Sequence, residues 1–341
     1  MALVGDETGL LKYIVRDAVD AVSNSQDRAA AVNVLCCVDD GGALAGLDNG
    51  AVLRWTADGG VTEAVAPTGA HLRGVGALPE NRVVTCSDAG VMGIHVKGEG
   101  EGDCDEITVA SNATCCAMLG TSAVVAGKDV EVRLWDLQER ACVFTAKNVA
   151  KDKLDVAVPV WNTSVCWLAP HLICAGTAFN RLRVYDVRAQ RKPVQDWSLQ
   201  TIARGPTGTL APNRTVTALH GGGGGGDDEA VVVVADSMGS VRKIDVRTGK
   251  SPGSFAGAVG SVRGVHVRDG VVATCGLDRY LRLYSLATTA VQSKVYCKQR
   301  LNAVVLVGVP AVQAREDDED DHWFAEDVDE PARKQARRAL T

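Results

Sequence analysis

Aromatic residues are scarce in this sequence, where Phe, Trp and Tyr together account for 4% of 341 residues. Val, Ala and Gly supply most of the apolar mass, and this composition suits short strands and tight turns better than helices. No stretch approaches the roughly 18 uncharged apolar residues that a membrane-spanning helix requires. The N-terminal residues MALVGDETG lack a basic region followed by an apolar stretch. We therefore expect neither a signal peptide nor a membrane partner.

The closely spaced residues of metal and catalytic sites are also missing. None of the 11 cysteines forms Cys-x-x-Cys, and most lie in apolar, strand-like segments such as NVLCCV and TCCAM. This pattern indicates buried, reduced thiols in an intracellular protein without a zinc site. The six histidines are scattered, and no Gly-x-Ser-x-Gly, His-Glu-x-x-His or kinase signature occurs. We predict a protein that is not an enzyme and has no catalytic residues, cofactor, metal or small-molecule substrate.

The negative charge is confined to the end of the chain. The net charge is −6, and residues 316–341 alone contain ten acidic and four basic residues. Residues 1–315 are therefore neutral overall. A neutral body can carry a basic face, so the overall acidity does not exclude RNA as a partner.

A unit made of a strand, a turn and a second strand occurs seven times along the chain. The turn residues that anchor the units are Asp6, Asp48, Asp88, Asp129, Asn180, Asp236 and Asp278, spaced 42, 40, 41, 51, 56 and 42 residues apart. A period of ~40–45 residues is typical of four-stranded propeller blades. The segment VEVRLWD alternates apolar and polar residues and ends in Trp135-Asp136, the Trp-Asp pair typical of such blades. At Asp48-Asn49-Gly50 we expect a type I′ hairpin turn.

One further apolar strand precedes each unit except the first. The missing strand is predicted at the other end of the chain, at Leu301–Val307. Pairing of this strand with the N-terminal unit would close the ring and remove two exposed sheet edges. The predicted fold is all-β: a seven-bladed WD-repeat β-propeller over residues 1–310, closed by the C-terminal strand, followed by a disordered tail at 311–341.

Two segments interrupt or follow this pattern. The run Gly221–Gly226 is glycine-rich like a phosphate-binding loop but lacks the Gly-Lys-Ser/Thr ending, so we interpret it as a flexible loop. The tail contains the acidic run Glu316–Asp321, the apolar-aromatic group His322-Trp323-Phe324 and the basic cluster Arg333–Arg338. Apolar residues between charged blocks are typical of short recognition motifs, and also of tails without a function.

Several segments together resemble one family closely. They are GDETGLLK at 5–12, LRG at 72–74, WDL at 135–137, FTAKNV at 144–149, DKLD at 152–155, VPVW at 158–161, GSVRG at 260–264, CGLDRYLR at 275–282, KVYCK at 294–298 and LN at 301–302. These segments resemble the WD-repeat protein seventy-four family, called Nsa-one in yeast. The resemblance covers nearly the whole predicted propeller, and the segments 147–161 and 276–282 are much more specific than generic blade motifs.

The resemblance implies a non-enzymatic scaffold in biogenesis of the large (60S) ribosomal subunit. The family joins nucleolar pre-60S particles, with other assembly factors, ribosomal proteins and pre-rRNA as partners. An AAA-type ATPase releases it later. The implied location is the nucleolus or nucleus. In animal members of the family the tail is basic and extended, whereas here it is short and mainly acidic.

The candidate partner-binding residues are charged or polar residues near loops at one end of the blades. They are Lys12, Arg73, Lys147, Asn148, Lys151, Asp152, Lys153, Asp155, Arg263, Arg279, Arg282, Lys294 and Lys298. Such side chains pair with phosphates or with acidic protein surfaces. Ordinary solvated surface charge is the alternative for each of them.

The aspartates Asp48 and Asp278 are expected to be structural, because turn aspartates accept backbone N–H groups. We expect Trp55, Trp135 and Trp161 to pack between blades, although an exposed Trp161 would be a binding anchor. Two alternatives to the assembly-factor hypothesis stay open. One is a WD-repeat adaptor in another complex, such as a ubiquitin-ligase substrate receptor. The other is a hydrolytic propeller with a carboxylate pair across its channel.

Overall fold

The computed structural model describes residues 1–22, 26–38, 40–96, 104–151, 154–202, 214–221 and 231–308. These residues form seven antiparallel sheets of four strands each, which we number as blades 1 to 7. Blade 1 contains β28 (Leu301–Leu306), β1 (Ala2–Asp6), β2 (Leu11–Val15) and β3 (Ala18–Ala21). Its outer strand is followed by a short 3₁₀ helix, Arg28–Ala30, which the carboxylate of Asp27 caps.

The other six blades use four consecutive strands each. Blade 2 contains β4 (Val32–Cys37), β5 (Ala43–Leu47), β6 (Val52–Thr56) and β7 (Gly60–Val65); blade 3 contains β8 (Leu72–Leu78), β9 (Arg82–Ser87), β10 (Val91–Val96) and β11 (Cys104–Thr108). Blade 4 contains β12 (Ala113–Leu119), β13 (Ser122–Gly127), β14 (Val130–Asp136) and β15 (Ala141–Thr145); blade 5 contains β16 (Asn162–Ala169), β17 (Leu172–Thr177), β18 (Arg181–Asp186) and β19 (Gln195–Ser198). Blade 6 contains β20 (Val216–Gly221), β21 (Val231–Asp236), β22 (Val241–Asp245) and β23 (Lys250–Phe255); blade 7 contains β24 (Val262–Arg268), β25 (Val271–Gly276), β26 (Tyr280–Ser285) and β27 (Val291–Tyr296). The short helix α1 (Leu199–Ile202) follows β19.

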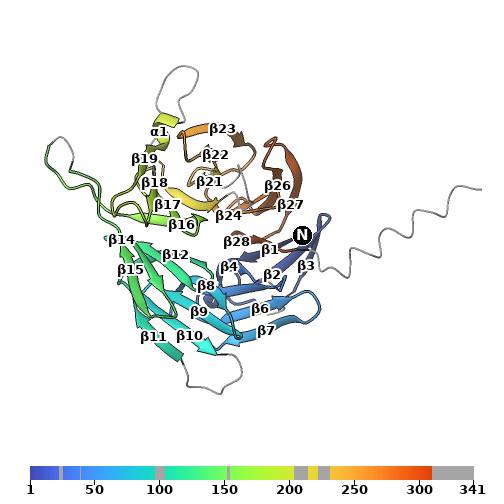
Figure 1. Cartoon of the computed structure of the whole chain (residues 1–341). Coiled ribbons are helices and arrows are strands. Elements are labelled where there is room, and N and C mark those ends of the chain that lie inside the picture. The colour runs from blue at the N-terminus through green and yellow to red at the C-terminus, as the bar shows by residue number, and fades with distance from the viewer. Residues whose placement is uncertain are drawn as a thin grey trace, which may run out of the picture. The chain divides into compact units, whose positions relative to one another are not determined.

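The blades are arranged in a closed ring. The first strands of the blades contact one another in the order β4, β8, β12, β16, β20, β24, β28 and again β4. Figure 1 shows these strands around the centre, with the other strands of each blade farther out. The seven-bladed propeller predicted from the turn spacing is therefore confirmed.

The ring is closed by strands from opposite ends of the chain. β28 pairs with β1 in antiparallel register, with Leu3 opposite Val305 and Val4 opposite Val304. β1 in turn pairs with β2, so blade 1 is completed by the last described strand. This confirms the predicted closure. The predicted tail at 311–341 and the glycines at 222–226 lie outside the described residues.

The turn at Asp48-Asn49-Gly50 differs from the type I′ turn that we expected. Of these three residues only Gly50 has a positive φ, +87°. A type I′ turn needs positive φ at both central residues, whereas Gly50 alone in the left-handed region is typical of a three-residue turn with a glycine bulge. The bond from the Leu47 N–H to the Ala51 carbonyl (2.9 Å) closes this longer turn.

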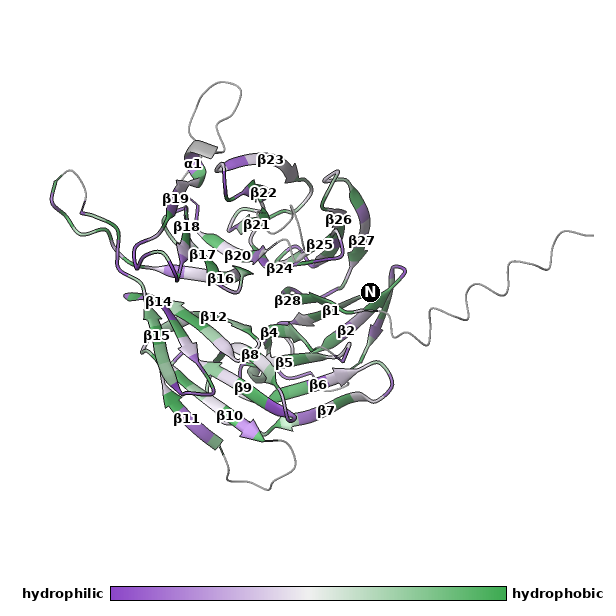
Figure 2. Ribbon diagram, in the orientation of Figure 1, coloured by the Kyte–Doolittle hydropathy of each residue, from purple (hydrophilic) through white to green (hydrophobic). Residues whose placement is uncertain are grey.

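The hydrophobic core lies between neighbouring blades. Leu3 and Leu11 of blade 1 pack with Ala43 and Trp55 of blade 2, and the other blade junctions are built in the same way. Figure 2 shows hydrophobic residues concentrated on the inner strands and hydrophilic residues on outer strands such as β11. The outer strands carry mainly exposed side chains, as expected for the one solvent-facing edge of each blade.

Candidate protein-binding face of the propeller

Loops of two kinds meet on one face of the ring. Each inner strand begins after the loop that leaves the outer strand of the preceding blade. In an antiparallel blade the second strand runs back to the face where the first began, and the third starts there. The loops before the inner strands and the turns between second and third strands therefore share a face. We call it the entry face; residues 48–51 and 66–71 lie on it.

The described candidate residues lie on the entry face or close to it. Arg73 and Arg263 are the second residues of the inner strands β8 and β24. Arg279 lies in the turn before β26, and Lys298 lies in the loop after β27. The positions of the candidates are thus consistent with a single surface, although their exposure differs widely.

Lys12 is buried, and its charge is already paired. Its ammonium lies 2.8 Å from the Asp6 carboxylate and donates a hydrogen bond to the Cys297 carbonyl oxygen (2.7 Å). Asp6 also accepts bonds from the N–H groups of Thr8 (2.8 Å) and Leu10 (3.0 Å). Lys12 therefore holds the first hairpin against the loop after β27, and it has little surface to offer a partner.

Arg282 is buried in a similar way. Its guanidinium lies 2.6 Å from the Asp278 carboxylate and 5.2 Å from the centre of the Tyr280 ring. Lys294 approaches the same ring, with its ammonium 4.5 Å from the ring centre, but it is exposed. Of these two candidates only Lys294 has a charge that a partner could reach.

Four other candidate cations are exposed. Arg73 lies 3.8 Å from the carboxylate of Asp88, an exposed pair of the kind that contributes little to stability. Arg263, Arg279 and Lys298 are exposed as well, and in the described part of the chain none of the three forms an ion pair. These charges are available on the surface.

The connection between β15 and β16, described at residues 146–151 and 154–161, forms an arm at the junction of blades 4 and 5 (Figure 1). The N–H of Lys147 donates to the Arg191 carbonyl (2.8 Å). The side-chain amide of Asn148 donates to the Val158 carbonyl (2.6 Å), which joins the two limbs of the arm.

Near the end of the arm, the Lys151 ammonium and the Asp155 carboxylate form an exposed pair at 3.1 Å. The candidates Asp152 and Lys153 lie outside the described residues. The loop that meets the base of the arm carries three further exposed cations, Arg188, Arg191 and Lys192, which the sequence analysis did not select. The contact of Arg191 with Lys147 could not be found from sequence, because the two residues are 44 positions apart.

The three tryptophans for which packing between blades was predicted differ in their burial. Trp55 is buried and Trp135 is partly buried, both in clusters between blades as expected. Trp161 instead lies on the entry face, exposed over about two fifths of its surface. The expectation that it packs between blades is wrong, because Trp161 precedes β16, where the loop runs over the turns of blades 4 and 5.

Asp278 has the role expected of a turn aspartate, which is to accept backbone N–H groups, whereas Asp48 is held by side chains. Asp278 accepts hydrogen bonds from the N–H groups of Tyr280 and Val259, both at 3.2 Å. Asp48 instead accepts from side chains, the amide of Asn33 (2.6 Å) and the imidazole of His71 (2.8 Å). Both carboxylates are therefore occupied within the fold.

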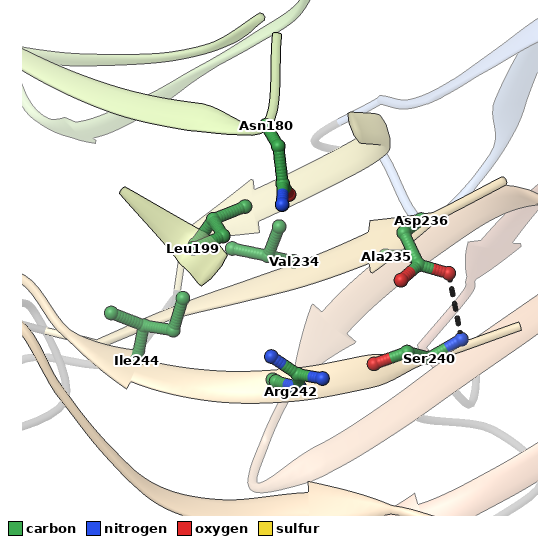
Figure 3. A pocket seen from close by; sticks show the side chains of 8 residues that line it. All are labelled: Asn180, Leu199, Val234, Ala235, Asp236, Ser240, Arg242 and Ile244. Carbon is green, nitrogen blue, oxygen red and sulfur yellow. Dashed lines mark hydrogen bonds between the residues drawn. The ribbon is translucent and has the colours of Figure 1, made fainter. Parts of the chain in front are cut away.

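A hollow between blades 5 and 6 has a volume of about 20 Å³, room for one water molecule. Asn180, Asp236 and Arg242 supply polar groups to its wall (Figure 3). Asp236 is the one carboxylate in this wall, and it accepts the N–H groups of Met238 and Ser240, both at 2.9 Å. This hollow does not provide the carboxylate pair of a hydrolytic propeller.

A larger hollow of about 290 Å³ does have two carboxylates in its wall, Asp40 and Glu80. Asp40 pairs with Arg54, and Glu80 lies 3.4 Å from Arg82. Burial raises the pKa of the Asp40 carboxyl, but hydrogen bonds from the Gly42 N–H and from Arg54 lower it below its ordinary value overall, which leaves Asp40 unsuited to act as a general acid. All 11 cysteines are free thiols.

Among the described residues, no group of three His, Cys, Asp or Glu side chains could hold a metal ion. No helix within the same residues is long and apolar enough to cross a membrane. The entry face exposes carboxylates such as that of Asp129 as well as cations and apolar side chains.

The closed ring of seven four-stranded sheets defines a WD-repeat β-propeller protein. The WD40 propeller domain of Doa1 has the same fold, with a TM-score of 0.65, 14% identity and coverage of 89% of this chain and 90% of that one. WD repeat-containing protein 74 of Mus musculus is 32% identical over 331 residues, which cover 89% of this chain and 80% of the relative. The human protein of that name is 31% identical with the same coverage.

The chain belongs to the family of WD repeat-containing protein 74, as the resemblance in its sequence indicated. The ribosome biogenesis protein NSA1 of Saccharomyces cerevisiae is 27% identical over 183 residues, which cover 48% of this chain and 39% of that protein. No family model matches the sequence.

Proposed function

We propose that this protein is a non-enzymatic scaffold in the biogenesis of the large ribosomal subunit. The observation that carries the proposal is family membership together with the similarity to yeast proteins named for ribosome biogenesis. The rigid ring supports the scaffold role, because blades packed through shared cores hold loops at fixed positions. The protein would join nucleolar pre-60S particles, and an AAA-type ATPase would remove it.

The proposed contact residues are the accessible candidates of the entry face and the arm, all of them exposed except Asn148, which is half-buried. They are Arg73, Lys147, Asn148, Lys151, Asp155, Arg263, Arg279, Lys294 and Lys298. Assembly factors, ribosomal proteins and pre-rRNA are the proposed partners, since exposed Arg and Lys pair with carboxylates and phosphates alike. Lys12 and Arg282 contribute through the fold, because both charges are buried in ion pairs.

Affinity purification of the tagged protein, with RNA and protein identified together, tests this proposal. We expect large-subunit precursors, including precursor rRNA, and a fluorescent fusion in the nucleolus. The variant Lys147→Glu should reduce the recovery, because it reverses an exposed charge at the base of the arm. Lys250→Glu is the matched control, since Lys250 is also exposed but begins β23 on the opposite face.

Recovery of no ribosomal precursor at low salt would contradict the proposal. Replacement of residues 147–156 by a glycine-serine linker separates it from the adaptor alternative. An assembly factor should then show delayed rRNA processing, whereas an adaptor of a ubiquitin ligase should leave rRNA processing unchanged.

A further inference from the structure

Four large apolar side chains are exposed on the entry face over three successive blades. They are Trp161 (40% exposed) just before β16, Phe179 (38%) in the turn between β17 and β18, Met238 (62%) in the turn between β21 and β22, and Val259 (72%) in the loop before β24. We call these four residues the apolar arc. Only Trp161 was considered as a binding residue in the sequence analysis. The other three were not, because an isolated apolar residue in a turn is not part of the alternating pattern that marks a strand.

The first two members are in direct contact. The rings of Trp161 and Phe179 lie edge to face with their centres 6.5 Å apart. The N–H of Ala178 donates to the Trp161 carbonyl (3.0 Å), which fixes the two loops to each other. The arc therefore begins as one aromatic surface held by the backbone.

Hydrogen bonds carry the contact on to blade 6. The Thr215 hydroxyl donates to the Ala178 carbonyl (3.4 Å), and the Thr215 carbonyl accepts the N–H of Ser237 (3.0 Å). Ser237 directly precedes Met238, so Phe179 and Met238 are carried on adjoining turns. The two turns are thus linked through Thr215, which lies in the loop before β20.

The contact continues from blade 6 to blade 7. A Cβ added to Gly239 would lie 2.7 Å from the Ala258 carbonyl oxygen, so the turn that carries Met238 packs against the loop that carries Val259. The N–H of Val259 donates to the Asp278 carboxylate (3.2 Å). This bond brings the end of the arc beside Arg279, which follows Asp278 in the chain.

Cations flank both ends of the arc. At the Val259 end, Arg263 and Arg279 are exposed, whereas the Asp278 carboxylate between them is occupied by Arg282. At the other end, the Lys128 ammonium lies 5.3 Å from the centre of the Trp161 ring. The surface thus combines apolar side chains with accessible positive charge.

This combination suits a protein segment better than a nucleic acid. Single-stranded RNA binds through phosphate contacts and base stacking on aromatic rings. Met238 and Val259, the most exposed members of the arc, offer neither. Apolar side chains of a partner would be buried on them, and the charge complement of Arg263 and Arg279 is a carboxylate.

We propose that the apolar arc is a docking site for a protein segment that places apolar side chains on Met238 and Val259 and a carboxylate at Arg263 and Arg279. This inference rests on the proposed function, because the partner is taken to be a component of the same assembly. It adds to that function the chemistry by which one partner would be recognised.

The test uses the purified full chain and a displayed library of random peptides, each about 12 residues long. We expect enriched sequences to contain two or more apolar residues and at least one acidic residue. Synthetic peptides of these sequences should bind at least about tenfold more weakly to Met238→Ser, Val259→Ser and Arg263→Glu variants. Raising the salt from about 50 mM to about 300 mM should weaken binding to the wild type.

Val143→Ser and Leu119→Ser are the matched controls, since both residues are exposed apolar side chains outside the arc. They should leave the peptide affinity unchanged. Thermal melting of every variant establishes that the ring is folded, so that a weaker affinity reports on the surface.

Three results would overturn the inference. The first is peptide binding that Met238→Ser and Val259→Ser do not change. The second is a preference for single-stranded RNA of about 20 nucleotides that depends on Arg263 alone. The third is self-association of the chain, seen by sedimentation, that the arc variants abolish. Recovery of ribosomal precursors is measured separately, so the proposed function can fail while peptide binding stands, or the reverse.

Discussion

The carboxylate of Asp6 and the ammonium of Lys12 lie 2.8 Å apart, and both side chains are buried where the ring closes. The pair joins the end of β1 to the start of β2, and Lys12 extends the link to the Cys297 carbonyl, which follows β27 of blade 7. A buried pair of this kind is costly to break, because removal of one partner leaves an uncompensated charge.

The variant Lys12→Met tests this role. We expect the free energy of unfolding to fall by about 3–5 kcal/mol, because the Asp6 carboxylate would stay buried without its cation. Urea denaturation measures the change. The double variant Lys12→Met with Asp6→Asn should recover part of the loss, and Lys151→Met, which removes an exposed pair, should change stability by less than about 1 kcal/mol. A loss for Lys12→Met as small as that of Lys151→Met would contradict the structural role.

The closure of the ring predicts energetic coupling between the two ends of the chain. Leu3 and Val305 face each other across β1 and β28, and both are fully buried. The change Leu3→Ala should cost about 2–5 kcal/mol of unfolding free energy. Combined with Val305→Ala in a double-mutant cycle, it should show a coupling of about 0.5–3 kcal/mol. Val232, buried in blade 6, supplies the comparison pair, for which Leu3→Ala and Val232→Ala should add within about 0.5 kcal/mol.

Gly90 is a position where any side chain should be disruptive. It has φ +81°, and an added Cβ would lie 1.3 Å from the Ala110 carbonyl oxygen. Left-handed backbone strain alone costs about 1–2 kcal/mol. The change Gly90→Ala should lower the free energy of unfolding by more than this, because the backbone of the next loop must also move. Gly120→Ala is the control: Gly120 has φ +55° and nothing within 4 Å of the added Cβ. Equal melting temperatures for the two variants would show that the close approach has no energetic effect.

His266 should make stability depend on pH. Burial, followed by the nearby His220 and Arg268, lowers the pKa of His266 well below its ordinary 6.5. Its Nδ1 accepts the N–H of Leu306 (3.3 Å), and its Nε2 lies 3.7 Å from the Cys37 sulfur. Protonation would remove the first bond and place a charge beside Arg268.

The sign of the pH effect follows from the lowered pKa. The unfolded chain binds a proton at higher pH than the folded chain, so the contribution of His266 is present above its ordinary pKa and is lost as the pH falls. We expect the urea midpoint of the wild type to decrease from about pH 7.5 to about pH 5.5, and to decrease less in His266→Gln. His71 is the opposite case, because its bond to Asp48 raises its pKa. The variant His71→Gln should therefore make the decrease steeper, and identical pH profiles for both variants would refute the assignment.

Much of the fold could be predicted from the sequence because a propeller repeats its local rules. Each blade needs a tight turn between its second and third strands, and residues such as Asp48 and Asp88 mark these turns at a nearly constant spacing. The first repeat lacked its inner strand, and one strand, Leu301–Leu306, was left over after the last repeat; together they predicted that the ring closes in blade 1. The type of the turn at Asn49-Gly50 was not predictable in the same way, because it depends on φ angles that the residue types alone do not determine.

The exposure of the candidate residues could not be predicted. Lys12 and Arg282 are residue types usually found on the surface, and the charge of each is balanced in the interior by a nearby aspartate, Asp6 or Asp278. The exposure of Met238 and Val259 was equally hidden, because both are isolated apolar residues whose surroundings come from neighbouring blades. Local patterns specify strands and turns, whereas the surface of a ring depends on how adjacent blades meet.

The pairing of β28 with β1 also constrains how this protein is made. During translation the first hairpin leaves the exit tunnel long before its partner strand, Leu301–Leu306, is synthesised. Blades 2 to 7 can each be complete on the nascent chain, but the hairpin keeps an open edge until Leu306 has emerged. A product that ends before Leu301 therefore keeps that strand edge exposed and open to pairing with another chain.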